Sequence, residues 1–284
     1  MPELPEVETT KEGLKRDLVG QKILKVELSD KKLRFPYDKN FEKKIIGKYI
    51  LSITRRAKYI IFKLSNEVKI ISHLGMSGSY RIIEKKLFNN RQKIKHDHFI
   101  LKTDKFVVIY NDPRRFGYIL LHSDSNIEHE RLSHLGYEPL SKNCNAENLS
   151  SLMYKKDRNI KNVLMDQKII AGLGNIYVCE ALYKSGISPL LEARRLVSKN
   201  RTPKKELIFL VKNIKKIIES SIIQGGSSLK DYVNTQGKMG YFQNNFNVYG
   251  REGKKCISKD CSSSIKRIIQ SNRSTFFCPS CQKK

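Results

Sequence analysis

The sequence predicts an α+β protein in which a short N-terminal helix and a set of antiparallel strands precede a helical region and a small cysteine-rich end. Three observations lead to this order. Short runs of β-branched and aromatic residues occupy positions 21–125, helical periodicity replaces them over 131–224, and four of the six cysteines fall within 256–281. A length of 284 residues suits about two domains of roughly 150 residues each.

The composition excludes several classes of protein. Hydrophobic residues make up 39% and aromatic residues 9% of the chain, which is enough for packed cores and excludes wholesale disorder. No apolar run approaches about 18 residues, so a membrane span is not expected. The N-terminus carries acidic residues where a secretory signal needs a basic and then an apolar run. We therefore expect a cytoplasmic protein.

The net charge indicates the kind of partner. Lys and Arg total 55 against 28 Asp and Glu, which gives a net charge of +27. Nucleic acid is the expected partner, because each neutralised phosphate releases a counterion. A lysine-rich composition with solvated faces would give the same charge. An anionic membrane surface is the weaker alternative, since no basic amphipathic helix supports it.

The N-terminal half is predicted to contain one helix and several strands. Residues 3–18 form a short helix with Pro5 in its first turn. The strands that follow alternate or form short apolar runs, and their spacing suggests an antiparallel sandwich or barrel. FVVIY-NDPRRFG-YILLH is interpreted as a hairpin that turns at Asp112, Pro113 and Gly117.

The region from 131 to 224 is predicted to be helical. Its clearest helix is PKKELIFLVKNIKKIIESSIIQ. The residues expected on its apolar face are Leu207, Val211, Ile214, Ile218 and Ile222. Residues 225–243 are rich in glycine and polar residues and are predicted to form a long loop, and loops of this length are usually functional or mobile.

The C-terminal cysteines predict a metal site. Cys256, Cys261, Cys278 and Cys281 form two pairs whose spacing suits one tetrahedral zinc ion, and disulfides are the alternative. Four thiolates leave no position for a catalytic water, so the ion is structural and supplies folding energy. Cys144 and Cys179 are expected to be buried thiols in a reducing compartment.

The cysteine-rich end is also strongly basic. Residues 250–284 contain nine Lys and Arg residues but only two acidic residues, Glu252 and Asp260, so this finger is expected to bind nucleic acid. Arg273 lies at a plausible hairpin tip and is predicted to reach a groove or a phosphate.

Several segments follow one another from residue 2 to residue 281: MPELPEVETT, RRAKYI, HLGMSG, NDPRRFG, IIAGLGNIY, GYFQ…NVYGREG and the four-cysteine finger. Together they resemble formamidopyrimidine-DNA glycosylase, a bacterial enzyme family that removes oxidised purines from DNA. The resemblance implies a monomer that binds damaged double-stranded DNA in the bacterial cytoplasm. It also implies an N-terminal helix with an antiparallel β-sandwich at 1–130, a helical domain with a helix-two-turns-helix motif and a lesion-capping loop at 131–248, and a zinc finger at 249–284.

The resemblance implies a bifunctional glycosylase and lyase whose catalytic residues are Pro2, Glu3, Glu6 and Lys58. After removal of Met1, the secondary amine of Pro2 would attack the sugar C1′ and form a Schiff base, and β,δ-elimination would follow. Glu3 would move protons as a general acid and base. Glu6 would help to orient the site, and Lys58 would contact the phosphate or the lesion. Without the family pattern, Lys58 would be interpreted as one more lysine at a strand edge.

The resemblance also implies DNA-binding residues. A glycosylase has to flip the nucleotide out of the duplex, and Met76, Arg114 and Phe116 match the family's residues that fill the resulting void. Met76 alone would be interpreted as a core methionine. The remaining DNA contacts carried over are Lys161 and Asn175 in the helix-two-turns-helix, and Lys230 and Tyr241 in the loop.

One departure and three alternatives stay open. The first cysteine pair is C-x4-C, where the family pattern is C-x2-C, and this puts the geometry of the first knuckle in doubt. The alternatives are the sister endonuclease VIII type, which takes oxidised pyrimidines, a DNA-binding protein without catalysis, and an RNA-binding protein. No partner spacing suggests catalysis or metal binding for the histidines at 73, 96 and 98, which are interpreted as structural.

Overall fold

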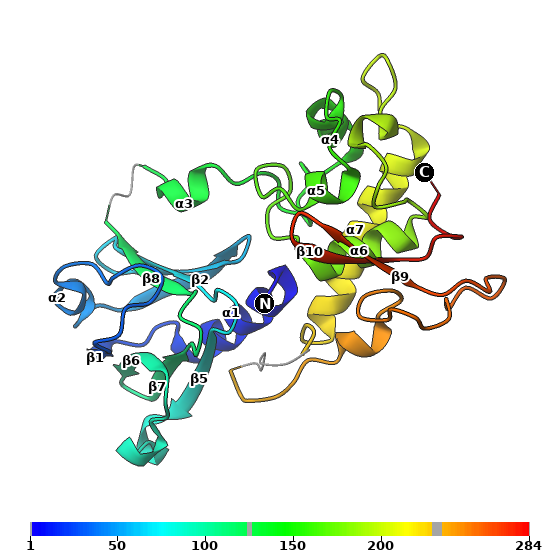
Figure 1. The fold of residues 1–284 in the computed structure, drawn as a ribbon. Helices are drawn as coiled ribbons and strands as arrows, with labels where there is room; N and C mark the ends of the chain where they lie inside the picture. Colours follow the sequence, from blue (N-terminus) through cyan, green and yellow to red (C-terminus); the bar gives the residue numbers. More distant parts are fainter. Residues whose placement is uncertain (1, 124–126, 229–234, 284) are drawn as a thin grey trace. The chain divides into compact units, whose positions relative to one another are not determined.

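The computed structural model describes residues 2–123, 127–228 and 235–283, which fold as two compact units (Figure 1). Unit 1 comprises residues 1–133 and 224–241, and unit 2 comprises residues 134–223 and 242–284. The three domain ranges expected from the sequence stay a prediction. In the structure, however, the segment 224–241 groups with the N-terminal half and not with the helices that precede it.

Unit 1 begins with the predicted helix, α1 (Leu4–Leu18). Its apolar face is fully buried at Val7, Leu14 and Leu18. The helix start is fixed by a capping box, in which the Glu6 side chain accepts the backbone N–H of Glu3 at 2.8 Å. The helical prediction for residues 3–18 is therefore confirmed.

The strands of unit 1 form two four-stranded antiparallel sheets. The first has the order β1 (Ile23–Leu28), β6 (Asp97–Thr103), β7 (Phe106–Asn111) and β5 (Ser79–Glu84). The second has the order β2 (Ile50–Arg56), β3 (Tyr59–Leu64), β4 (Lys69–His73) and β8 (Tyr118–His122). One apolar core joins both sheets and α1, which confirms the β-sandwich. The short elements are α2 (Phe41–Ile45), η1 (Lys85–Leu87), η2 (Asn90–Gln92) and α3 (Glu130–Ser133).

The prediction that residues 106–122 form a hairpin is wrong. β7 pairs with β5 and β6, whereas β8 pairs with β4, so the NDPRRFG segment crosses from one sheet to the other. The turn residues do reverse the chain, because Asp112 accepts the Gly117 N–H at 2.8 Å and Arg115 has a φ of 56°. A turn signal predicts the reversal, but it does not decide which strands become hydrogen-bonded neighbours.

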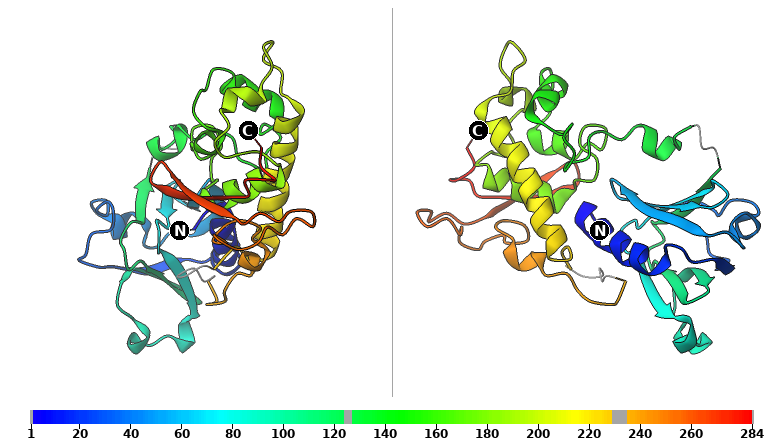
Figure 2. Two further views of the ribbon diagram at one scale, coloured as in Figure 1. Left: turned by 45° about the vertical axis from the view of Figure 1, so that its right-hand side comes forward. Right: turned by 180° about the vertical axis from the view of Figure 1, so that it is seen from behind.

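Unit 2 contains the predicted helices and a two-stranded hairpin. The helices are α4 (Ala146–Met153), α5 (Ile160–Leu164), α6 (Asn175–Lys184) and α7 (Lys205–Ile223), with short turns η3 (Ala193–Leu196) and η4 (Phe242–Asn245). α7 packs beside α6 (Figure 2) and buries most of its predicted apolar face, with Ile222 only half-buried. β9 (Lys266–Gln270) and β10 (Arg273–Phe277) form the hairpin. Among the described residues, no helix combines the length and the apolar composition that a membrane crossing requires.

Candidate functional site

The N-terminal residues are held inside unit 1. Pro2 is buried, and Glu3 and Glu6 are each only 1% exposed. Because α1 starts at Leu4 and its capping box fixes the backbone of Glu3, the residue that follows Pro2 has a defined position. The structure therefore brings three of the predicted catalytic residues together at the head of one helix.

Glu6 also joins α1 to the segment 224–241. Its second carboxylate oxygen accepts the backbone N–H of Ser227 at 2.7 Å and the Ser227 hydroxyl at 3.0 Å. Gly226 lies against this carboxylate with a φ of +81°, and a Cβ there would come within 2.9 Å of Glu6 Oε1. Only glycine fits this close approach without strain.

The base of this loop is closed by backbone contacts. Tyr241 donates its N–H to Gln224 O at 3.1 Å, and Gly240 donates to the Ser228 hydroxyl at 2.9 Å. The Tyr241 side chain is 64% exposed, as a DNA contact requires. Lys230, the other residue predicted in this loop, lies outside the described residues.

Lys58 lies in the tight turn between β2 and β3, and this turn is tied to α1. Arg55 donates to Glu8 of α1 at 2.5 Å and to the carbonyl of Ala57 at 2.9 Å. Burial opposes ionisation of Glu8, but hydrogen bonds from Lys11 and Arg55 lower its pKa. The half-buried Lys58 therefore lies on a turn that Arg55 holds in a fixed position relative to α1.

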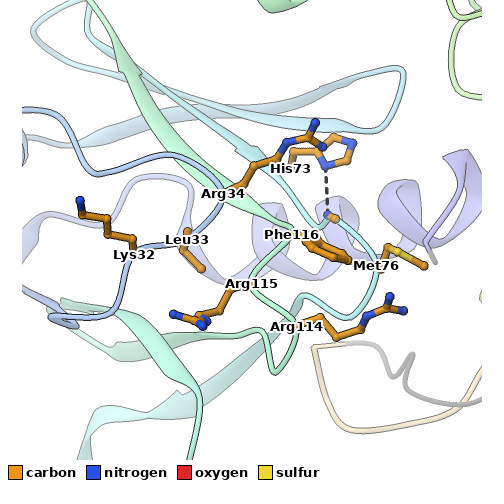
Figure 3. Close-up of a pocket in the computed structure, with 9 residues that line it drawn as sticks. Lys32, Leu33, Arg34, His73, Met76, Arg114, Arg115 and Phe116 are labelled. Carbon is orange, nitrogen blue, oxygen red and sulfur yellow. Dashed lines mark hydrogen bonds between the residues drawn. The ribbon is translucent and has the colours of Figure 1, made fainter.

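Met76, Arg114 and Phe116 line one pocket although they come from two separate loops (Figure 3). Met76 is 36% and Phe116 45% exposed, which is unusual for large apolar side chains that pack in a core. The guanidinium carbon of Arg114 lies 5.0 Å from the centre of the Phe116 ring. The structure therefore brings the three predicted void-filling residues together on the surface of unit 1.

His73 lines the same pocket, although only a structural role was predicted for it. Its Nδ1 accepts the Gly75 N–H at 3.0 Å, and its ring stacks on Tyr118 at 5.2 Å. Burial, and then the charges of Lys58 and Arg34, lower the pKa of His73 to about 3. The ring is therefore neutral, and its proton resides on Nε2. Its place three residues before Met76 in HLGMSG is the sequence feature that could have identified it as a pocket residue.

In unit 2, the predicted DNA contacts gather around the hairpin. Asn175 is the first residue of α6, after Gly174 as N-cap, and its side-chain amide donates to the carbonyl of Ser274 at 2.8 Å. Lys161 is fully buried and donates to the Thr275 hydroxyl at 2.6 Å. The structure thus gives Lys161 a position beneath the hairpin, whereas Arg273 is exposed at its tip.

The hairpin tip is a two-residue turn. Ser271 and Asn272 have φ values of 47° and 58°, and Arg273 pairs with Gln270 directly after the turn. Such left-handed pairs suit the tight turns that join antiparallel strands. The predicted position of Arg273 at a hairpin tip is therefore confirmed.

The four C-terminal cysteines form a metal centre. Their sulfur atoms all lie within 4.8 Å of one another, with 3.8 Å between Cys256 and Cys281 and 3.6 Å between Cys261 and Cys278. A tetrahedral zinc ion with Zn–S bonds of about 2.3 Å requires sulfur separations of about 3.8 Å, so the four thiols fit zinc. The longer first knuckle does not disturb this arrangement, because Cys261 donates its N–H to Ser258 O at 3.1 Å within it.

Comparison with family models covers most of the chain. Residues 1–119 match the formamidopyrimidine-DNA glycosylase N-terminal domain, residues 135–233 match the H2TH domain of the same enzyme, and residues 253–284 match the zinc finger found in FPG and IleRS. The chain belongs to the formamidopyrimidine-DNA glycosylase family. By this membership it is a DNA glycosylase of base excision repair, with one structural zinc held by its four clustered cysteines.

Individual glycosylases of the family align with the whole chain. The formamidopyrimidine-DNA glycosylases of Bartonella tribocorum and Agrobacterium fabrum are 46% and 43% identical to it over 293 and 298 residues, with both proteins covered completely in each case. Among solved structures, a complex between the Lactococcus lactis Fpg and an abasic site containing DNA is similar with a TM-score of 0.87 and 35% identity over 100% of both chains.

The glycosylase fold explains why residues far apart in sequence meet in unit 1. The capping box fixes the chain end, the Arg55–Glu8 pair fixes the Lys58 turn to the same helix, and Glu6 fixes the loop base. Each of these links uses a buried or half-buried carboxylate of α1. The helix therefore acts as the common support for the predicted catalytic residues.

Proposed function

We propose that this glycosylase excises oxidised purines, namely 8-oxoguanine and formamidopyrimidines, from duplex DNA and then cleaves the strand as an AP lyase. The observation that carries the proposal is the buried Pro2–Glu3 pair at the start of α1, with the Lys58 turn tied to that helix. After Met1 is removed, this arrangement presents a secondary amine beside a carboxylate.

The first step is nucleophilic. The Pro2 nitrogen attacks C1′, the bond from C1′ to the base breaks, and Glu3 protonates the sugar ring oxygen as the ring opens to an iminium. A terminal α-amino group has a pKa of about 8, so a useful fraction is neutral at cellular pH. The departing base carries away the bonding electron pair and takes up the proton that the Pro2 nitrogen loses as the iminium forms.

The strand is then cut by two eliminations. The iminium acidifies the C2′ proton, whose removal forms a C2′–C3′ double bond and expels the 3′ phosphate. Loss of a second proton, at C4′, expels the 5′ phosphate, and hydrolysis of the iminium releases the amine. Lys58, and His73 through its Nε2 proton, supply donors for phosphate oxygens next to the lesion.

Access to C1′ requires the nucleotide to leave the duplex. In the proposed function, Phe116 inserts between base steps, Arg114 hydrogen-bonds the orphaned base and Met76 fills the remaining space. The exposure of the two apolar side chains at one pocket supports this role.

The grip on DNA involves both units in this proposal. The exposed Arg273 and the α6 N-terminus with Asn175 contact phosphates, and Lys161 supports them through Thr275. In unit 1, Tyr241 and Lys230 contact the everted nucleotide or its backbone.

The experiment compares matched duplexes that carry 8-oxoguanine opposite cytosine, thymine glycol, a preformed abasic site, or no damage. We expect cleavage of the 8-oxoguanine duplex well above that of the thymine glycol duplex, and a covalent adduct when borohydride is present. One structural relative is a Lactococcus lactis Fpg bound to an oxidised pyrimidine containing DNA, so the thymine glycol arm is required. Preferential cleavage of thymine glycol would assign the endonuclease VIII type of substrate instead.

Two further measurements test the mechanism. Intact mass of the purified protein has to show loss of Met1, and a chain that keeps Met1 and still cleaves at full rate would overturn the Schiff base on Pro2. Glu3→Gln is expected to abolish base excision while the abasic duplex is still trapped, because an abasic sugar opens to its aldehyde without a proton from Glu3. Duplex binding without any adduct would support a DNA-binding protein without catalysis.

A further inference from the structure

The loops that carry the pocket residues pack against each other through their backbones. One loop spans 74–78 between β4 and β5, and the other spans 112–117 between β7 and β8. Gly75 has a φ of +62°, and a Cβ there would lie 2.3 Å from Gly117 N and 2.4 Å from the carbonyl carbon of Phe116. A Cβ on Gly117 would lie 1.8 Å from the Tyr110 hydroxyl. Neither loop can accept a side chain at this contact.

A buried carboxylate lies beneath this contact. Asp112 is fully buried, and each of its two carboxylate oxygens accepts a hydrogen bond from a different loop. Oδ1 accepts the Ser77 hydroxyl at 2.5 Å, whereas Oδ2 accepts the Gly117 N–H at 2.8 Å. The Tyr110 hydroxyl lies 3.4 Å from Oδ2. A carboxylate suits this place because it offers only acceptors to these donors.

Ser77 completes the link between the loops. Its hydroxyl, in a residue that is 6% exposed, donates to Asp112 and at the same time accepts the backbone N–H of Arg114 at 3.1 Å. Ser77 directly follows Met76 in one loop, and Arg114 belongs to the other. One hydroxyl and one carboxylate therefore link the residue after Met76, the backbone N–H of Arg114 and the residue after Phe116.

We propose that Asp112 and Ser77 are positioning residues that hold Met76, Arg114 and Phe116 as one preformed wedge. The inference rests on the proposed void-filling role of the three residues. A preformed wedge inserts without having to order two loops during eversion, and ordering loops opposes insertion through lost conformational entropy. Neither residue touches DNA in this proposal, since both are buried under the loops.

The main test is Asp112→Asn. The amide has nearly the shape of the carboxylate, but it turns an N–H group toward donors that need an acceptor. We expect the rate of eversion, followed by stopped-flow fluorescence of 2-aminopurine beside an 8-oxoguanine, to fall by at least about tenfold. Ser77→Ala removes only the bridging hydroxyl and serves as the milder variant if Asp112→Asn folds poorly.

Matched controls separate positioning from stability. Asp97→Asn alters another buried carboxylate of the same sandwich, which binds Arg81 at 3.0 Å and Asn111, the last residue of β7, at 2.8 Å instead of Ser77 and Gly117. Ser72→Ala alters a buried serine that contacts Tyr80 at 2.7 Å. Both controls are expected to lower the thermal midpoint as much as the test variants do and to leave eversion within about twofold.

A double-mutant cycle decides whether the two residues act through the wedge. In a Phe116→Ala background, Asp112→Asn is expected to cause little further loss, because the wedge it positions is already gone. The inference would be overturned if the double variant lost eversion rate by the product of the two single losses. It would also be overturned if Asp112→Asn and Asp97→Asn had equal eversion rates. A wild-type protein that fails to act on the 8-oxoguanine duplex would instead overturn the proposed function, so the two failures are distinguishable.

Discussion

The two wedge loops of unit 1, residues 74–78 and 112–117, and the β9–β10 hairpin of unit 2 are short surface segments, but different interactions stabilise them. The wedge loops lie on a sandwich whose core joins two four-stranded sheets and a helix. The hairpin has two strands, and the small apolar cluster at its base includes all four metal-binding cysteines. A buried carboxylate fixes the first, and a metal ion fixes the second.

This difference predicts which property, activity or local folding, each region loses first when its support is removed. A sandwich with a large core keeps its fold when one surface contact is lost, so damage to the wedge loops should change activity before it changes folding. A two-stranded hairpin is marginal in water without further support. Loss of its metal should therefore remove local structure and the DNA contacts together.

Zinc removal should have the largest effect and should affect only one of the two regions. Incubation with a strong chelator is expected to weaken binding to duplex DNA by at least about a hundredfold, because the folding free energy of the finger comes from the metal. Far-ultraviolet circular dichroism should keep the β signal of the sandwich. The measurement is a binding titration before and after chelation, followed by re-addition of zinc.

The same experiment can break the comparison. If chelation also unfolded the sandwich, the two regions would depend on the same support. If duplex binding survived complete zinc loss, measured by atomic absorption on the same sample, the hairpin would be held by contacts such as that of Lys161 with Thr275 and not by metal.

The contact beneath the hairpin predicts the next largest effect. Thr275→Val keeps the shape of the residue but removes the acceptor that the buried Lys161 ammonium uses at 2.6 Å. Loss of a hydrogen bond to a buried charge costs about 1–3 kcal/mol, so urea-induced zinc release should shift to lower concentration. Thr275→Ser retains the hydroxyl and is the matched control. Equal midpoints for the two variants would show that this contact contributes nothing.

The elements that the sequence predicted well are those with a local signal. The helix at 3–18, the periodic helix that became α7 and the metal-binding cysteines were all identified from spacing, because periodicity and ligand pairs are properties of neighbouring residues. The placement of Arg273 at a hairpin tip follows from the same kind of signal.

The features that the sequence did not predict depend on tertiary contacts. The strands flanking NDPRRFG join different sheets, because pairing partners are chosen by the whole sandwich and not by the turn. The burial of Lys161 could not be predicted either, since its partner Thr275 is 114 residues away. His73 was interpreted as structural because no partner spacing suggests a function for it, and a sequence motif does not report the burial that keeps its ring neutral.

Removal of the charge at the hairpin tip should have a smaller effect, which should be visible in the salt dependence of DNA binding. Arg273→Ala removes one cation at an exposed tip, so the slope of log affinity against log salt concentration should fall by about 0.9. Lys259→Ala, in the first zinc knuckle, removes the same charge away from the tip and serves as control. Identical slopes for the two variants would mean that Arg273 acts only through the general charge of the finger.

The smallest expected effect concerns the stability of unit 1 as a function of pH. Burial lowers the pKa of His73 to about 3, and it also lowers those of His98 and His129, so the folded unit resists protonation. The unfolded chain takes up these protons below a pKa of about 6.5, so stability is complete above that value and falls as the pH drops below it. Between pH 7 and 5.5, His73 alone should cost about 1 kcal/mol of unfolding free energy.

The pH effect sharpens the comparison because the shifted histidines lie in unit 1, and unit 2 has only His134. Urea unfolding of unit 1, followed at pH 7 and 5.5 through hydrogen exchange of the sandwich strands, measures it. His73→Gln should be less stable at pH 7 but lose less stability on acidification than the wild type. The ionisation of Glu27 does not contribute in this pH range, because hydrogen bonds from Lys93, Lys102 and Lys25 lower the pKa of Glu27 to about 2. An unchanged pH dependence in His73→Gln would show that this ring is not kept neutral by its burial beside the wedge.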